Sequence, residues 1–289
     1  MDASFEQVGA QGDTAAGSAP ASPVVLSVPH AGRDYPPALL AALRLPAATL
    51  VVLEDRHIDA VARAARTHEA MLVQHRARAW IDLNRSEYER DPKVDDGVRP
   101  HSQPAPSAKV RSGLGLVPRR AGAAGDLWRR RFGAAEVAAR IAEDYRPYHD
   151  ALAAMLVAAR ARFGIAVLID LHSMPPIGQQ AQIVLGDRFG QSCASRFMAR
   201  LETVAVADGV RTAINTPYAG GHILERHAAP ASGIHAVQIE FDRTLYLDRA
   251  LDRPGPGLDR TIALLRRMLA AVADEALAGD RPAIALAAE

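Results

Sequence analysis

The chain has 289 residues, of which 49% are hydrophobic and 23% charged, as in ordinary globular proteins large enough to bury a core. Its formal net charge of +1 provides no overall field for nucleic acid or membrane surfaces, and Cys193 as the single cysteine excludes a disulfide framework. We recognise no signal peptide and no apolar run near the roughly 20 residues of a membrane span, so a cytoplasmic protein is expected.

The first 22 residues are rich in Ala, Gly, Ser and Gln without hydrophobic periodicity, which predicts a disordered tail over 1–22 and a domain over 23–289. Apolar runs predict strands, and helical spacing of apolar residues predicts helices. In the first part of the chain we expect strands at 24–28 and 50–53, a helix at 58–67 that Asp55 caps, and strands at 71–73 and 79–83. A helix follows at 134–163, interrupted at Pro147, and then a strand from 165 and a helix at 191–207. The last expected elements are a loop at 215–222, a strand at 236–239 and a helix at 258–277.

Strands that alternate with helices indicate an α/β fold with a mainly parallel sheet covered on both faces. Between 87 and 126 this pattern dissolves into Pro, Gly, Ser and charged residues. Loops longer than about 15 residues inside a domain are uncommon and often functional. We therefore interpret 87–126 as a long loop that forms a substrate lid.

Polar residues cluster where five of the predicted strands end. They are His30, then Glu54, Asp55 and His57, then Asn84 and Arg85, then Asp170, His172 and Ser173, and finally Glu240. The carboxyl ends of parallel strands meet at one edge of a sheet, where α/β proteins bind their ligands. The five clusters together predict one metal-dependent active site.

Zinc in a hydrolase typically takes three His or acidic ligands and leaves a position for water. His30, Asp55 and His172 are the best three, and Glu240 suits the general base that moves a proton from water to the leaving nitrogen. No His-Glu-x-x-His motif is present, so the ligands must converge through the fold. Other divalent ions also accept such ligands.

Each of these residues also has a structural interpretation. A lone histidine at a strand end is more often hydrogen-bonded than metal-bound. Asp170 either caps a turn or orients His172, and Glu240 alone could pair with Arg243. Asn84 and Arg85 could together hold a substrate carboxylate, with an internal ion pair of Arg85 to Asp82 or Glu87 as the alternative. Several such residues at separate strand ends favour the functional interpretation.

An ordered series of short motifs runs through the chain from about residue 23 to residue 248: Ser27-Val28-Pro29-His30-Ala31-Gly32, Glu54-Asp55-Arg56-His57-Ile58-Asp59, Ile81-Asp82-Leu83-Asn84-Arg85, Tyr145-Arg146-Pro147-Tyr148-His149, Asp170-Leu171-His172-Ser173 and Gln238-Ile239-Glu240. With this series the chain resembles the N-formylglutamate amidohydrolase family. The resemblance implies a single-domain fold like that of the zinc carboxypeptidases and aspartoacylases, with a mixed, mostly parallel sheet between helices.

In that wider group a His-Ser/Thr pair contains the second metal-binding histidine, an Asn-Arg pair holds the substrate carboxylate, and a late glutamate is the base. The carboxypeptidases place a glutamate ligand three residues after the first histidine, where this chain has Arg33. The acidic ligand is therefore inferred as Asp55, with Glu54 or His57 as alternatives. The zinc ion is expected to stabilise the oxyanion that forms when water attacks the amide, with either Arg111 or His222 as a hydrogen-bond donor to it.

The resemblance implies zinc-dependent hydrolysis of N-formyl-L-glutamate to formate and glutamate in histidine degradation. The nearest alternative is the same chemistry on another N-acyl or N-formimino amino acid or a short peptide. A non-catalytic module that binds a carboxylate would leave Glu240 without a role. A nucleic-acid patch at 111–131 is disfavoured by the near-zero charge, and a serine hydrolase by the lack of a Gly-x-Ser-x-Gly motif. The oligomeric state cannot be inferred from the sequence.

Overall fold

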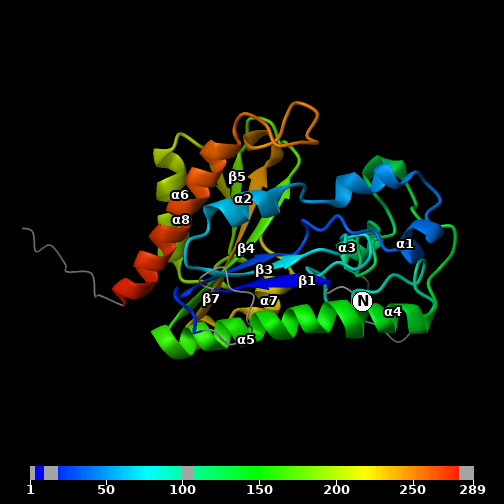
Figure 1. The fold of residues 1–289 in the computed structure, drawn as a ribbon, viewed down its shortest axis with the longest axis horizontal. Coiled ribbons are helices and arrows are strands. Elements are labelled where there is room, and N and C mark those ends of the chain that lie inside the picture. Colours follow the sequence, from blue (N-terminus) through cyan, green and yellow to red (C-terminus); the bar gives the residue numbers. More distant parts are fainter. Residues whose placement is uncertain (1–3, 10–18, 99–106, 280–289) are drawn as a thin grey trace, which may run out of the picture.

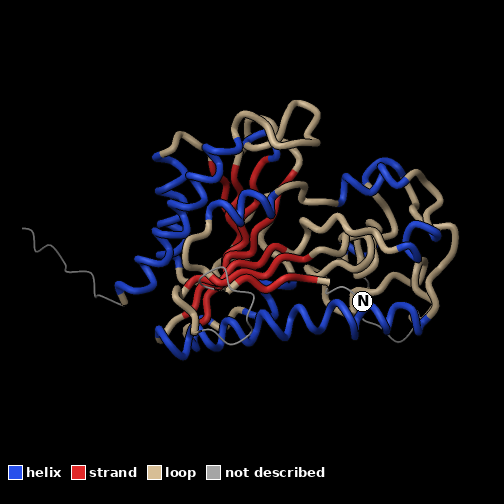
Figure 2. The backbone as a smooth tube through the Cα atoms, in the orientation of Figure 1, coloured by secondary structure: helices blue, strands red, loops and turns tan. Residues whose placement is uncertain are grey.

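The computed structural model describes residues 4–9, 19–98 and 107–279. A seven-stranded sheet lies between helices on both faces (Figures 1 and 2). The strands, in the order in which they lie across the sheet, are β1 (Phe5–Val8), β3 (Ala70–Gln74), β2 (Val24–Val28), β4 (Ala166–Met174), β7 (Ile234–Asp242), β5 (Ile183–Gly186) and β6 (Thr212–Ile214). The central strands β3, β2, β4 and β7 are parallel, whereas β1 and β5 run antiparallel to their inner neighbours. This confirms the mixed, mostly parallel α/β fold.

One face of the sheet is covered by α2 (Ile58–Ala65), α6 (Ser195–Ala207) and α8 (Leu258–Ala278), and the other by α5 (Arg146–Phe163) and α7 (His222–His227) (Figure 1). None of the helices within the described residues is both long and apolar enough to cross a membrane. A lobe of irregular chain extends from one edge of the sheet. It contains α1 (Pro37–Ala42), α3 (Ala108–Arg111) and 3-10 turns at Ala47–Leu53 and Gly122–Ala124. Two further 3-10 turns, Pro230–Ser232 and Arg243–Leu245, flank β7.

The long helical rod consists of α4 (Ala134–Arg140), a π-helical turn (Ile141–Tyr145) and α5. The interruption expected at Pro147 therefore appears as a π turn just before it, and Pro147 lies in the first turn of α5. The residues before Pro147 are themselves helical, so the proline removes one backbone hydrogen bond from the rod, and the wider π turn lies where that bond is missing.

The alternation of side chains along the central strands positions the polar residues. In β4, Val167, Ile169 and Leu171 pack toward α2 and α8, whereas Leu168 packs toward α5. Successive side chains of a strand point to opposite faces, so Asp170 and His172 lie on the Leu168 face. The register places Ser27 of β2 beside Asp170, and places Gln238 and Glu240 of β7 beside Asp170 and His172. The α5 face of the sheet thus changes from apolar to polar toward the carboxyl ends of the strands.

Two predicted strands are wrong. Residues 50–53 belong to the 3-10 turn Ala47–Leu53, and residues 79–83 form turns and irregular chain. Leu50, Leu53, Ala79, Ile81 and Leu83 of these segments are buried in one hydrophobic cluster, and a short apolar run does not distinguish a strand from such a segment. Asp55 does not cap α2, whose N-cap is His57 in a left-handed conformation. Helix α6 begins at Ser195 rather than residue 191.

The prediction of a disordered tail over 1–22 is also wrong in part. Residues 5–8 form β1, which pairs antiparallel with β3 from Phe5 opposite Gln74 to Val8 opposite Met71. Without β1, the edge of β3 would have unpaired backbone hydrogen-bonding groups, and the composition of residues 5–8 does not reveal that they pair with this edge. Residues 1–3 and 10–18 lie outside the described residues, as do 99–106 within the predicted lid. The short strands β5 and β6 were not predicted.

Candidate metal centre and active site

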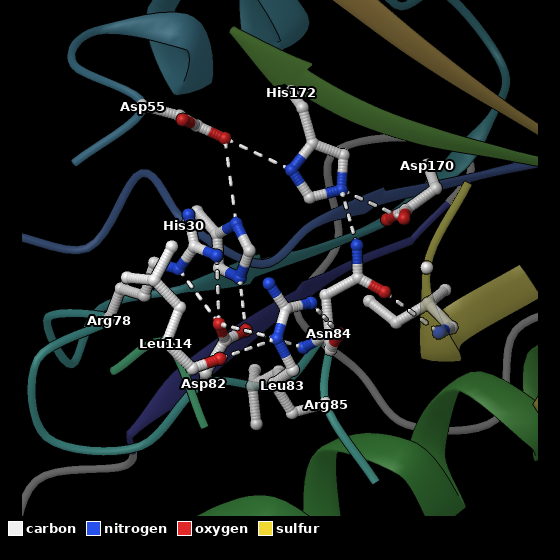
Figure 3. A network of polar contacts seen from close by, with 12 residues as sticks. His30, Asp55, Arg78, Asp82, Leu83, Asn84, Arg85, Leu114, Asp170 and His172 are labelled. Atoms are coloured by element: carbon white, nitrogen blue, oxygen red, sulfur yellow. Dashed lines mark hydrogen bonds and ion pairs between the residues drawn. The ribbon is translucent and has the colours of Figure 1, made fainter. Parts of the chain in front are cut away.

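Three side chains from separate segments converge on one point (Figure 3). His30 follows β2, Asp55 follows the 3-10 turn Ala47–Leu53, and His172 lies inside β4. All three are buried, and one ligand atom of each lies within 4.8 Å of the others. The Asp55 Oδ2 atom is 3.0 Å from Nδ1 of His172 and 3.7 Å from Nδ1 of His30.

These distances fit a divalent metal ion. Two ligand atoms at about 2.0–2.1 Å from a tetrahedral zinc ion are about 3.4 Å apart, between the two observed separations. Two imidazole nitrogens and a carboxylate oxygen are the donor types that hydrolytic zinc sites use. The residue types and their spacing therefore fit a metal ion with three protein ligands.

The outward ring nitrogen of each histidine faces a buried carboxylate. His30 Nε2 lies 2.7 Å from Asp82 Oδ1, and His172 Nε2 lies 2.8 Å from Asp170 Oδ2 (Figure 3). The Ser27 hydroxyl donates to the other Asp170 oxygen at 2.8 Å. A carboxylate in this position fixes the ring and leaves Nδ1 available to a metal. Asp170 thus lies where it can orient His172, as one of the two alternatives expected, and Asp82 is placed in the same way beside His30.

Carboxylates dominate the electrostatic environment of His172. Burial lowers the pKa of His172, but Asp170 and Asp55 raise it well above its ordinary value. Burial raises the pKa of Asp55, whereas hydrogen bonds from His172 and His30 lower it to below its usual range. The position of His172 therefore favours a positive charge, which either a proton or a metal ion can supply.

Glu240 stands beside His172 on the neighbouring strand. Burial raises the pKa of Glu240 to about 7, and Gln238 Nε2 donates to its Oε1 atom at 2.9 Å. Arg243, its alternative partner, instead donates to Ser173 Oγ at 3.2 Å and to Asp55 Oδ1 at 3.4 Å. A carboxyl whose pKa lies near neutrality is suited to accept and return a proton.

Asn84 and Arg85 both border the cavity at this site. Arg85 donates from Nη1 to Asn84 O at 2.6 Å and from Nε to Leu114 O at 2.9 Å, and its Nε lies 3.8 Å from Asp82. The Asn84 side chain accepts from Ile223 N at 2.9 Å. A Cβ atom at Gly221 would lie 2.3 Å from Asn84 Oδ1, so glycine is required for this close approach. Asn84 thereby anchors the start of α7 to the cavity wall.

The cavity has a volume of about 290 Å³ and is bordered by both charged and apolar side chains. Its lining includes three polar residues that the sequence did not indicate, Arg78, Lys109 and Tyr218, and also Arg243, which the sequence indicated only as a possible partner of Glu240. Arg78 pairs with Asp82 four residues later, at 2.8 Å, and this spacing is the only sequence signal that could have drawn attention to it. The others lie on segments without periodicity that only the fold brings to the cavity.

Four predicted site residues lie away from the cavity. The Glu54 carboxylate contacts the Tyr35 hydroxyl and Arg56, and His57 Nε2 lies 3.1 Å from the Asp252 carbonyl oxygen. Both residues neighbour Asp55, but the chain turns at this point and directs only Asp55 inward. Two further residues, Arg111 and His222, are not among the lining residues: Arg111 is exposed, and His222 is 3.3 Å from Glu225.

Comparisons with known proteins agree with this geometry. Residues 22–247 match the family model described as N-formylglutamate amidohydrolase. The chain belongs to the N-formylglutamate amidohydrolase family. It is 32% identical over 236 residues to the N-formylglutamate deformylase of Pseudomonas aeruginosa, which covers 78% of this chain and 82% of that protein. The deformylase of Pseudomonas putida is 31% identical over 234 residues, with the same coverage.

Solved structures give the same picture. The crystal structure of N-formylglutamate amidohydrolase from Ralstonia eutropha JMP134 matches with a TM-score of 0.85 and 30% sequence identity, covering 96% of this chain and 99% of that one. A gene product of Agrobacterium tumefaciens, 21% identical, matches with a TM-score of 0.60 over 96% of this chain and 94% of its own. The second match shows a shared fold.

Proposed function

We propose that this protein is a metal-dependent amidohydrolase that cleaves the formyl amide of N-formyl-L-glutamate to formate and L-glutamate. The observation that carries the proposal is the buried group of His30, Asp55 and His172 in one cavity with Glu240 and Arg85. The deformylases of the two Pseudomonas species support the choice of substrate. We expect the reaction to serve histidine degradation in the cytoplasm.

We assign His30, Asp55 and His172 as ligands of one zinc ion, with Asp82 and Asp170 orienting the two imidazoles. When bound, the ion supplies Lewis acidity toward an amide carbonyl and toward a water molecule. Zinc is favoured by two imidazoles and one carboxylate, although other divalent ions accept the same ligands.

Glu240 is assigned as the group that takes a proton from the attacking water and returns it to the departing nitrogen. Its position beside His172 and its pKa near 7 suit both transfers, because the proton must be accepted and released at neutral pH. The amine leaves only after it is protonated, so one carboxyl group serves both steps.

Arg85 and Asn84 are assigned to the substrate α-carboxylate, since a guanidinium forms paired hydrogen bonds with a carboxylate. Arg78 replaces Arg111 and His222 as the proposed donor to the developing oxyanion. It borders the cavity and pairs with Asp82, the same carboxylate that contacts His30, so its cation lies beside the proposed metal group.

The direct test is release of formate from N-formyl-L-glutamate by the purified protein. Activity should disappear after treatment with a chelator and return when zinc is added to the chelator-free protein. Metal analysis should find one ion per chain. A metal-replete protein that releases no formate would contradict the proposed substrate, and full activity without a divalent ion would contradict the proposed chemistry.

A further inference from the structure

The cavity is bordered by four basic side chains, and three of them already face protein carboxylates. Arg78 is 2.8 Å and Arg85 is 3.8 Å from Asp82, and Arg243 is 3.4 Å from Asp55. The fourth is Lys109, on α3. Within the described part of the chain, no Asp or Glu oxygen lies within ion-pair distance of its ammonium group. Among the described residues, no carboxylate pairs with Lys109, so its positive charge is available to a ligand in the cavity.

Short contacts fix the position of Lys109 relative to Arg85. The Leu114 backbone joins the two, because its N–H donates to Lys109 O at 2.8 Å and its carbonyl accepts from Arg85 Nε at 2.9 Å (Figure 3 shows the second bond). Ser107 caps α3 by accepting from Val110 N, and its hydroxyl donates to Glu89 at 2.6 Å. The backbone that carries Lys109 is thus held next to Arg85, and both side chains border the cavity.

The two cations also differ in depth. Arg85 is only 7% exposed, whereas Lys109 is an exposed residue that borders the same cavity. Partial burial, together with the positive charges of Arg85 and Arg78, lowers the pKa of Lys109. Cations that face one cavity repel each other, and an anion bound between them relieves that repulsion. The cavity is therefore suited to a ligand that carries more than one negative charge.

We propose that Lys109 binds the side-chain carboxylate of the substrate and makes the cavity selective for N-acyl amino acids with an acidic side chain. This inference rests on the proposed function. The α-carboxylate is bonded to the carbon that carries the amide nitrogen, so it suits the deeper Arg85. The side-chain carboxylate is further from the reacting amide, so it suits Lys109 at the mouth.

The residue type supports this assignment. Lys93 and Lys109 are the only lysines of the chain, whose other basic residues are all arginines. An ammonium is a compact point charge, whereas a guanidinium is larger and planar. A lysine leaves more of the 290 Å³ cavity for the substrate than an arginine would.

The test compares Lys109→Met with the native protein on two substrates, N-formyl-L-glutamate and its uncharged isostere N-formyl-L-glutamine. We expect kcat/KM for the glutamate substrate to fall by about 10- to 100-fold, mainly through KM, because one charge-assisted contact is lost. The value for the glutamine substrate should change less than about twofold. Lys93→Met is the matched control, since Lys93 borders a separate surface cleft and should leave both values unchanged.

Equal losses on both substrates, or no loss on either, would overturn the assignment of Lys109. A native protein that prefers neither substrate would also overturn it while leaving the amidohydrolase function intact. Calorimetric titration with glutarate, a dicarboxylate without an amide, separates the two proposals further. Weaker glutarate binding by the Lys109→Met variant is expected even if the native protein releases no formate, and unchanged binding would contradict the proposal.

Discussion

Glu240 combines a buried position with a near-neutral pKa, and both come from its place in β7. Burial raises its pKa to about 7, while Gln238 holds one carboxylate oxygen at 2.9 Å. A glutamine at position 240 can place its carbonyl oxygen at the same point and keep that contact. It cannot take up and release a proton at neutral pH. The Glu240→Gln substitution therefore removes proton transfer while it preserves the side-chain shape and the contact with Gln238.

We expect Glu240→Gln to lower kcat by about 10²- to 10⁴-fold, the usual contribution of a general acid–base group. Bound zinc should remain at one ion per chain, because Glu240 is not among the three proposed ligands. Steady-state kinetics together with metal analysis checks both parts, and the same change at exposed Glu143 is the control. If the variant retained native kcat, another carboxylate would have to move the proton.

At the scale of elements, the hydrophobic pattern of the sequence predicted strands of the central sheet and helices that cover it. The predicted strand 24–28 and the helix that begins at 58 agree with β2 and α2, and Asp170, His172 and Glu240 were found because they interrupt apolar strands. The lobe was not predictable in this way. Its apolar side chains pack in irregular chain, so they carry no period that would reveal their structure.

The same limit explains the missed site residues. Arg78 and Lys109 reach the cavity from a turn and from the short helix α3, and Asp82 contacts His30. Their positions depend on contacts between segments distant in sequence. The sequence also could not separate Asp55 from its neighbours Glu54 and His57. Only the backbone conformation determines which of these three side chains points inward.

A pair of buried histidines joins α5 to α7 and should make stability depend on pH. His149 Nδ1 lies 2.9 Å from His227 Nε2, and His149 Nε2 lies 3.1 Å from Leu83 O. Burial, with the neighbouring positive charges, lowers the pKa of His149 to about 2 and that of His227 to about 4. Both are therefore neutral in the folded protein, whereas a histidine in the unfolded chain gains a proton below pH about 6.5.

Because the unfolded state then binds more protons, the free energy of unfolding should fall as pH decreases from about 6.5 to about 4, by up to about 1.4 kcal/mol per pH unit for each histidine. His227→Gln keeps a donor toward His149 but cannot titrate, so its stability should depend less steeply on pH. Urea unfolding at a series of pH values measures this difference. His68→Gln, at an exposed position, is the control, and an equal slope in native protein and His227→Gln would refute the prediction.

At the scale of the whole molecule, folding gathers buried carboxylates from distant parts of the chain. Asp55, Asp82, Asp170 and Glu240 all lie in or beside one cavity wall, where their charges are balanced in part by His172 and Arg78. The unfolded chain has no such cluster. A cation that binds this cluster therefore binds the folded state in preference to the unfolded state, and it must stabilise the fold.

We expect saturating zinc to raise the midpoint of thermal unfolding. At a free concentration of about 100 times the dissociation constant the gain is about 2.7 kcal/mol, which corresponds to roughly 4–5 °C for a chain of 289 residues. Differential scanning calorimetry of chelated and zinc-loaded protein measures the shift. His172→Ala removes one of the three ligands while leaving residues outside the cavity unchanged, so zinc should no longer raise its midpoint. A zinc-dependent shift of the same size in that variant would mean that the ion binds elsewhere and that the convergence of His30, Asp55 and His172 serves only to satisfy buried polar groups.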